Sequence, residues 1–178
     1  MILTEENIVS TSERQWLAAY VKMHHERKVR DALTAMQIEN FLPVQEEIRI
    51  WSDRKKKVER VLIPMMIFVK VNPQEQRTVV ELSSVLRYMV LRGEHAPTPI
   101  PDYQMDSFRF MVTNAEDSIT FDKELFQPGQ KVRVIKGSLK NLEGELITTN
   151  GKTKIAVRIE QLGCATVEMH SSMVEIVG

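Results

Sequence analysis

PGQKVRVIKGSLKNLEGEL, residues 128–146, contains the pattern that best predicts the fold of the C-terminal part of the chain. Residues 130–136 alternate in hydrophobicity, with Val132 and Val134 on one side and charged residues mostly on the other, which is typical of a half-buried strand. Gly137 ends this strand. A second strand is expected over residues 145–149, directly after Gly144, where a glycine suits a backbone that needs positive φ or close approach.

The remaining C-terminal sequence predicts three further strands. Asn150-Gly151 favours a type I′ hairpin turn, because both of its central residues need positive φ. The strands are expected over residues 154–159, 164–169 and 172–177, which gives a small five-stranded β-barrel without exposed sheet edges. Periodicity alone equally allows a generic module of the SH3 or OB type. The Pro128-Gly129 entry with Gly137 and Gly144 resembles the KOW motif of transcription elongation factors and ribosomal proteins.

Composition indicates a water-soluble protein of one or two modest domains. The chain has 178 residues, of which 43% are hydrophobic and 27% charged. No run approaches the ~20 apolar residues that span a bilayer, and the N-terminus lacks the pattern of a signal peptide. Its one cysteine, Cys164, excludes an internal disulfide and a thiolate metal cluster. We therefore expect a cytoplasmic protein without cofactor or metal.

The net charge of zero conceals an uneven distribution. Residues 1–13 carry three acids and no base, and residues 113–125 have a net charge of −3. Residues 14–112 and 126–178 have net charges of +4 and +2. We expect an acidic flexible tail (1–13), a first domain (14–112), an acidic linker (113–125) and a KOW domain (126–178). Such mildly basic domains are not typical of high-affinity duplex binders, so any nucleic-acid contact is expected to be local or supported by a partner.

Residues 14–112 predict an α+β domain with an antiparallel sheet and helices packed on it. Asn72, Pro73 and Glu75 form a helix start, with Asn as the N-cap and Glu three residues later. The expected order is βαββαβα. Its elements are a strand over 15–22, a helix over 24–39, a strand over 41–50, a polar turn over 51–57, a strand over 58–71, a helix from 73, a strand over 87–91 and a helix over 102–112.

Several local patterns make nearly the whole chain similar to the NusG family of transcription elongation factors. They are Trp16 with Tyr20-Val21-Lys22, Phe41-Leu42-Pro43, the proline-rich loop 97–101, and Leu162-Gly163-Cys164-Ala165-Thr166. Residues 51–56 (WSDRKK) resemble one specialised branch, the UpxY antiterminators of capsular polysaccharide operons. The chain departs from the family at residues 64–69 (PMMIFV), where the usual glycine and tyrosine after proline are missing.

The resemblance implies an apolar face on the first domain that binds the clamp helices of RNA polymerase. The matching positions are Tyr20, Ile63, Met66 and Phe68. We expect Tyr20, Met66 and Phe68 to form one connected, accessible patch, since exposed apolar patches mark contact surfaces. The alternative is that these residues belong to the core of the sheet. Arg77 and Thr78 match positions that contact the opposite side of the polymerase cleft.

Two further sites follow from the sequence and the resemblance. Arg54, Lys55, Lys56 and Lys57 lie between two expected strands, so they could meet DNA phosphates near the transcription bubble. They could equally form a solvated turn that deters edge pairing. Leu162 is expected to be exposed at a turn and to enter a partner's pocket, with Rho or a ribosomal protein as the implied partner.

The sequence contains no clear catalytic motif. Adjacent His24 and His25 point about 100° apart on a helix, and no helical zinc pair occurs. We predict a non-enzymatic, NusG-like elongation factor or antiterminator that suppresses pausing or termination, of a capsular or exopolysaccharide operon. The alternative is an RNA-binding or ribosome-associated KOW protein without polymerase contact. The β-branched strands of the C-terminal domain favour a barrel that keeps its fold.

Overall fold

The computed structural model describes residues 13–124 and 128–178, which divide into two compact units. The first unit comprises Met1–Leu42 and Ile63–Asp102, and the second comprises Pro43–Leu62 and Tyr103–Gly178. The acidic tail predicted over residues 1–13 lies almost entirely outside the described residues, as does the junction at 125–127.

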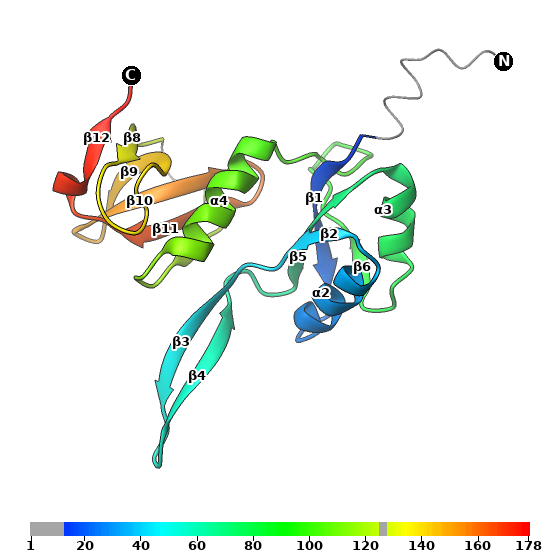
Figure 1. Ribbon diagram of the computed structural model, residues 1–178. Coiled ribbons are helices and arrows are strands. Elements are labelled where there is room, and N and C mark those ends of the chain that lie inside the picture. Colours follow the sequence, from blue (N-terminus) through cyan, green and yellow to red (C-terminus); the bar gives the residue numbers. More distant parts are fainter. Residues whose placement is uncertain (1–12, 125–127) are drawn as a thin grey trace. The chain divides into compact units, whose positions relative to one another are not determined.

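The first unit is an α+β fold built on one antiparallel sheet with the strand order β2-β5-β1-β6 (Figure 1). Its elements are β1 (Gln15–Val21), α2 (Glu26–Ala35), β2 (Glu39–Phe41), β5 (Met66–Val71), α3 (Pro73–Val80) and β6 (Val85–Tyr88). β1 and β5 are the central strands and almost all of their residues are buried. The predicted fold class, a helix-flanked N-terminal sheet, is confirmed.

The helix start predicted at Asn72 is present in full. The Asn72 side chain accepts a hydrogen bond from the Glu75 backbone N–H, and the Glu75 carboxylate accepts one from the Asn72 N–H. This reciprocal capping box satisfies two backbone donors at the beginning of α3. Helix α2 is shorter than predicted, because His24 and Gln37 both take positive φ and stop it at either end.

The second unit combines a β-hairpin, a helix and a six-stranded antiparallel sheet. The hairpin consists of β3 (Val44–Ile50) and β4 (Lys55–Val61), and α4 (Asp102–Asn114) begins at the boundary between the units. The sheet has the order β12-β8-β9-β10-β11-β7. Its strands are β7 (Thr120–Asp122), β8 (Gln130–Val134), β9 (Glu143–Thr149), β10 (Lys152–Ile159), β11 (Gly163–Glu168) and β12 (Val174–Ile176), the last preceded by the 3-10 turn η1 (Ser171–Met173).

All five strands predicted for the C-terminal domain are present, and β7 adds a sixth. β7 lies inside the segment 113–125 that the sequence predicts as a linker, and it pairs with β11. Gly163 makes this pairing possible, since a Cβ there would lie 2.0 Å from the Asp122 carbonyl oxygen. Gly144 is needed for close approach as predicted, because a Cβ would meet the Ala156 carbonyl at 2.7 Å.

The two long strands predicted over residues 41–50 and 58–71 are both broken in the structure. The first stops at Phe41 and resumes at Val44, since Pro43 has no N–H for a sheet ladder. The second is interrupted between Val61 and Met66, where Met65 takes a φ of 64° after Pro64. These breaks release residues 44–61 from the first sheet as a separate two-stranded ribbon, in which β3 pairs only with β4.

Candidate functional site

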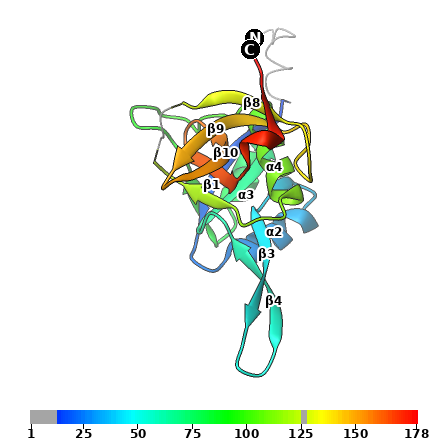
Figure 2. The same ribbon diagram turned by 90° about the vertical axis from the view of Figure 1, so that its left-hand side faces the viewer.

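The β3–β4 hairpin has no buried residue in either strand, and Figures 1 and 2 show it as a long two-stranded ribbon. Its strands pair continuously from Val44 opposite Val61 to Ile50 opposite Lys55. A further backbone hydrogen bond, from the Trp51 N–H to the Arg54 carbonyl at 2.8 Å, leaves only Ser52 and Asp53 in the turn. The basic run therefore begins at the tip and continues along β4, and it is not a loose turn over residues 51–57.

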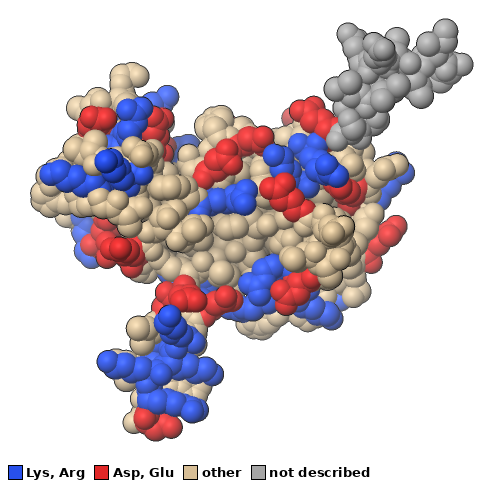
Figure 3. Space-filling model, in the orientation of Figure 1, with Lys and Arg blue, Asp and Glu red and all other residues tan. Residues whose placement is uncertain are grey.

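Charge is divided along the length of the ribbon. The distal part, residues 48–57, carries five bases and one acid, whereas residues 44–47 with 58–61 carry three acids and one base. Figure 3 shows the resulting cluster of Lys and Arg side chains over the hairpin. Lys57 pairs with Glu46 at 3.5 Å and Arg54 with Asp53 at 3.9 Å, while no described carboxylate forms an ion pair with Lys55 or Lys56. Exposed pairs at such distances contribute little, so the distal ribbon remains available to anions.

The proximal end of the ribbon is held by two side chains. Arg60 donates hydrogen bonds to the Ile119 carbonyl at 2.8 Å and to the Gln45 side chain at 3.1 Å. Gln45 donates to the Asp117 carbonyl and accepts from the Ile119 N–H, both at 2.8 Å. These bonds tie the acidic base of the hairpin to residues 117–119 and leave its basic tip unattached within the second unit.

Three of the apolar residues expected to bind polymerase, Tyr20, Met66 and Phe68, share one face of the first sheet, whereas Ile63 precedes β5 and lies outside its strands. The register pairs Tyr20 with Met66 and Ala18 with Phe68, and directly opposite residues project to the same side. Arg87, opposite Tyr20 on β6, lies 4.7 Å from the centre of its ring. The connected patch is therefore present in the strand register.

The predicted accessibility of this patch is wrong for most of its members. Ile63, Met66 and Phe68 expose 2%, 5% and 0% of their surface. They therefore belong to the core, which was the alternative interpretation of these residues. Phe68 packs against Phe41 on the neighbouring strand, with ring centres 6.4 Å apart. β5 is buried because it is paired on both sides, by β1 and β2, and its sequence is apolar on both faces. Tyr20 is half-buried and is the part of the patch that reaches the surface.

Arg77 and Thr78 lie on α3, next to Val79, which is fully buried. Arg77 is exposed and Thr78 is half-buried, with its hydroxyl donating to the Gln74 carbonyl at 3.3 Å. The two residues are placed at the surface of the first unit, where a partner could meet them. The structure does not bring them into the row formed by Tyr20, Met66 and Phe68.

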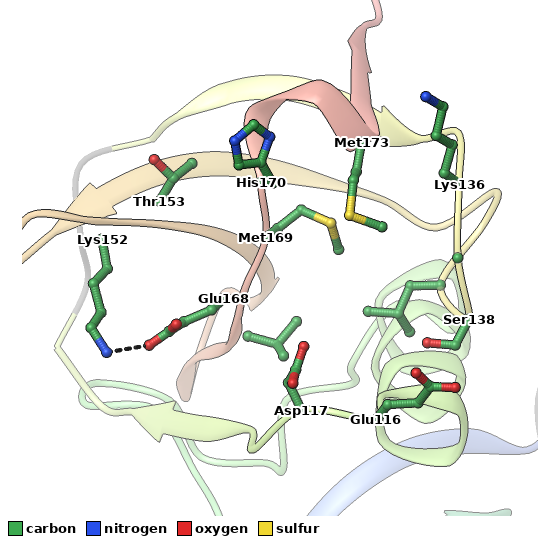
Figure 4. Close-up of a pocket in the computed structure, with 13 residues that line it drawn as sticks. Glu116, Asp117, Lys136, Ser138, Lys152, Thr153, Glu168, Met169, His170 and Met173 are labelled. Atoms are coloured by element: carbon green, nitrogen blue, oxygen red, sulfur yellow. Dashed lines mark hydrogen bonds and ion pairs between the residues drawn. The ribbon is translucent and has the colours of Figure 1, made fainter.

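Leu162 is half-buried, in the turn between β10 and β11, and its N–H donates to the Ile159 carbonyl at 2.9 Å. Leu162 is therefore less exposed than predicted, because this tight turn holds its side chain close to the sheet. It does not line the pocket of about 540 Å³ that the second unit contains. In Figure 4, Met169 and Met173 project into that pocket, with Glu116 and Asp117 on the opposite side.

The candidate catalytic groups have structural partners. His25 Nδ1 lies 2.8 Å from the Ser84 hydroxyl, and the buried Glu26 carboxylate accepts a hydrogen bond from the Met65 N–H at 2.9 Å. Glu26 thus supports the positive-φ residue at which β4 and β5 separate. Cys164 is fully buried, and burial raises the pKa of its thiol, which disfavours the nucleophilic thiolate.

Neither a metal centre nor a membrane helix emerges from the structure. Within residues 13–124 and 128–178, no three His, Cys, Asp or Glu side chains are grouped so that they could hold a metal ion. Every helix in this described part of the chain is too short or too polar to cross a lipid bilayer. The described residues provide three surfaces: a basic ribbon, the face of the first sheet at Tyr20, and exposed positions on α3.

Comparison with known proteins places this arrangement in a family. Residues 14–109 match the family described as "Transcription termination factor nusG". The "Transcription termination/antitermination protein NusG" of Pseudomonas aeruginosa is 31% identical over 141 residues, which cover 77% of this chain and 78% of that protein. The protein of the same name from Pasteurella multocida is 29% identical over 176 residues, covering 96% and 88%. The chain belongs to the NusG family.

A solved structure supports the fold independently. The structure titled "Domain interaction in Thermotoga maritima NusG" matches 93% of this chain and 98% of its own, with a TM-score of 0.52 and 19% sequence identity. At that identity the likeness concerns the fold alone. This likeness agrees with the mixed α+β architecture of the present chain, in which a helix-flanked sheet is followed by an antiparallel C-terminal sheet.

The hairpin carries an exposed aromatic residue that the sequence pattern does not predict as part of a site. Trp51 was assigned to a polar turn, yet its side chain is 49% exposed and the Lys56 ammonium lies 5.3 Å from its ring centre. Ile48 and Ile50, which were assigned to a strand of the sheet, are 64% and 80% exposed. The alternation Ile48-Arg49-Ile50 before Ser52-Asp53, together with the four bases that follow it at residues 54–57, was the available indication of a free ribbon.

Proposed function

We propose that this protein is a NusG-like transcription elongation factor or antiterminator that binds RNA polymerase and suppresses pausing or termination. The observation that carries the proposal is the family match over residues 14–109, which spans the sheet, α3 and the basic hairpin. The relatives described above have transcription termination and antitermination in their names. The proposed role requires binding surfaces and no catalytic group, so the protein is not expected to be an enzyme.

The proposed mechanism is a shift of a conformational equilibrium of the polymerase. A factor that binds the clamp helices more tightly when the clamp is closed stabilises the closed state by the difference in binding free energy. Tyr20, Arg77 and Thr78 are the proposed contact residues, since each has accessible surface. Ile63, Met66 and Phe68 are buried and would maintain the shape of the sheet beneath the contact.

The hairpin and the C-terminal sheet have separate proposed roles. The distal ribbon, with Arg54, Lys55, Lys56 and Lys57, would contact nucleic acid near the transcription bubble, because its charges lack strong internal partners. The C-terminal sheet is proposed to be a KOW domain that recruits Rho or a ribosomal protein, with Leu162 contributing apolar surface. The likeness of residues 51–56 to UpxY antiterminators supports a capsular or exopolysaccharide operon as the target.

Affinity purification of the full chain tests the proposal against the RNA-binding or ribosome-associated alternative. We expect RNA polymerase subunits to co-purify, and recovery of ribosomal RNA without polymerase would support the alternative. Arg77→Ala should reduce polymerase recovery, since Arg77 is exposed on α3. Arg92→Ala is the matched control, because it removes the same charge from an exposed loop position that has no proposed role. Equal loss in both variants would argue against the Arg77 contact.

A further inference from the structure

The register of the hairpin divides its basic run between two faces. Lys55 lies opposite Ile50, and Lys57 lies opposite Ile48, so these four residues share one side, the isoleucine face. Successive side chains of a strand alternate, which places Lys56 and its partner Arg49 on the other side. Trp51 and Arg54, joined by the hydrogen bond beyond the last strand pair, continue that side. Arg49, Trp51, Arg54 and Lys56 form the tryptophan face.

Trp51 is the one uncharged residue of the tryptophan face, so an attraction between charges does not account for its exposure there. Its indole is 49% exposed, whereas Trp16, the other tryptophan of the chain, is 1% exposed and part of the core. The Lys56 ammonium lies 5.3 Å from the Trp51 ring centre, within the range of a cation–π contact. This contact positions the ring at the tip of the ribbon and places a positive charge beside it. An exposed indole next to cations provides both a stacking surface and a phosphate contact.

The charges around the ring favour an anion at the tip. Lys56 forms no ion pair with a described carboxylate, and Arg49 and Arg54 pair only with neighbours in sequence, Glu47 and Asp53. The distal ribbon carries a net charge of +4, and the acidic base of the ribbon would repel a phosphate backbone from the other end. An extended polyanion is therefore directed to the tip, where Trp51 lies.

We propose that the tryptophan face binds single-stranded nucleic acid, with one unpaired base stacked on the Trp51 indole and the neighbouring phosphates beside Lys56 and Arg54. The inference rests on the nucleic-acid contact proposed for the hairpin and assigns it to one face and one kind of ligand. A duplex keeps its bases paired and stacked on each other, so it offers no free base surface to the ring. Single-stranded DNA and RNA share the required chemistry.

Trp51 itself reports the interaction, because base stacking quenches indole fluorescence while the buried Trp16 gives a constant background. The full chain is titrated with oligothymidylate of about 12 nucleotides, a length in the range of known single-strand sites, at low salt. Oligouridylate and a DNA duplex of equal length are titrated in parallel. We expect quenching by one or both single strands, and the tighter one identifies DNA or RNA as the source of the ligand.

Matched variants separate stacking from simple charge attraction. Trp51→Leu should lose the quenching and bind the oligonucleotide about five- to a hundredfold more weakly, as expected for one stacked base. Trp51→Phe retains a ring and should keep most of the affinity. Lys56→Ala should weaken binding about threefold or more, while Lys55→Ala, which removes the same charge from the isoleucine face, should have a smaller effect. All three sites are exposed, so thermal melting should be unchanged.

Three results would overturn the proposal. They are equal quenching by the duplex, unaltered affinity of Trp51→Leu, and equal losses in Lys55→Ala and Lys56→Ala. The test is independent of polymerase binding, which is measured by co-purification. Trp51→Leu should retain polymerase in that assay. Quenching by single strands in a protein that fails to bind polymerase would contradict the proposed function and support the nucleic-acid site.

Discussion

β4 and β5 are neighbours in sequence, separated by residues 62–65, and they behave in opposite ways. β4 (KKKVERV) is largely exposed, whereas β5 (MIFVKV) is buried at every position except Lys70, which is half-buried. Both segments have strand-forming patterns, and the sequence predicts one strand across most of them. The difference shows that a β-rich sequence predicts strand conformation well but does not predict whether the strand joins a core.

Strand pairing accounts for this difference. β5 is central, with β1 and β2 on either side, and apolar residues on both of its faces can be buried. β4 pairs with β3 alone, and its lysines would lose hydration if a second layer covered them. The break at Pro64 and Met65 lets one part of the chain build a stable core and the next present a charged ribbon.

The largest effect on stability is expected from Phe68→Ala in β5. Phe68 is fully buried against Phe41, so truncation removes apolar burial and leaves a cavity, at a cost of about 3–5 kcal/mol. Denaturant unfolding measures the change. Phe110→Ala is the control, since Phe110 is 37% exposed and should cost much less. Similar losses in both variants would contradict the central position of β5 in the core.

Variants at the break between β4 and β5 should lower the free energy of unfolding by an intermediate amount. Glu26→Ala leaves the part-buried Met65 N–H without its acceptor, which should cost about 1–3 kcal/mol. Glu26→Gln keeps a carbonyl oxygen as acceptor and should recover part of this loss. If both variants unfold at the denaturant concentration of the unmodified protein, Glu26 does not support the break.

A smaller, pH-dependent effect is expected at the far end of β5. The hydrogen bond from Arg14 lowers the pKa of Glu75 from its ordinary value, with a contribution from the Asn72 N–H. The resulting stabilisation is present above the unfolded pKa of about 4.3 and is lost as the pH falls through the lower folded value. Glu75→Gln should therefore be less stable than the unmodified protein near neutral pH, and the difference should shrink in acid. A constant difference across the acidic range would rule out the ion pair as its cause.

The smallest effect on stability is expected in the ribbon. Replacing Arg54, Lys55 and Lys56 together with alanine should change the free energy of unfolding by less than about 0.5 kcal/mol, since all three are exposed. Nucleic-acid binding should weaken, and its dependence on salt should become less steep because fewer counterions are released. The loss should diminish as ionic strength rises. Binding equal to that of the unmodified protein at low salt would show that the run is solvated and contacts no nucleic acid.

Local chemistry made much of the fold predictable. The capping box at Asn72, the positive φ of Asn150 and Gly151, and the close approach at Gly144 all follow from single residue types, and each is present. Without the hairpin, the observed order of the first domain is the predicted βαββαβα. The α+β class and the NusG family were both predicted from the sequence.

Long-range pairing made the rest unpredictable. β7 is too short to stand out in an acidic segment, and it exists because β11 offers it an edge. The family resemblance places Met66 and Phe68 on an accessible face, and neither the resemblance nor the spacing of the two residues indicates what covers that side of the strand. The exposure of Trp51 depends on a hairpin that becomes evident only when β4 is separated from β5.

Transcription by purified RNA polymerase on a template with a defined pause site, at low salt, tests the proposed function. The proposed function predicts that the full chain shortens the pause. It also predicts that the variant with alanine at Arg54, Lys55 and Lys56 still binds polymerase but shortens the pause less. A pause of unchanged length with saturating protein would contradict the proposed function. Equal activity of the variant would contradict the role of the ribbon.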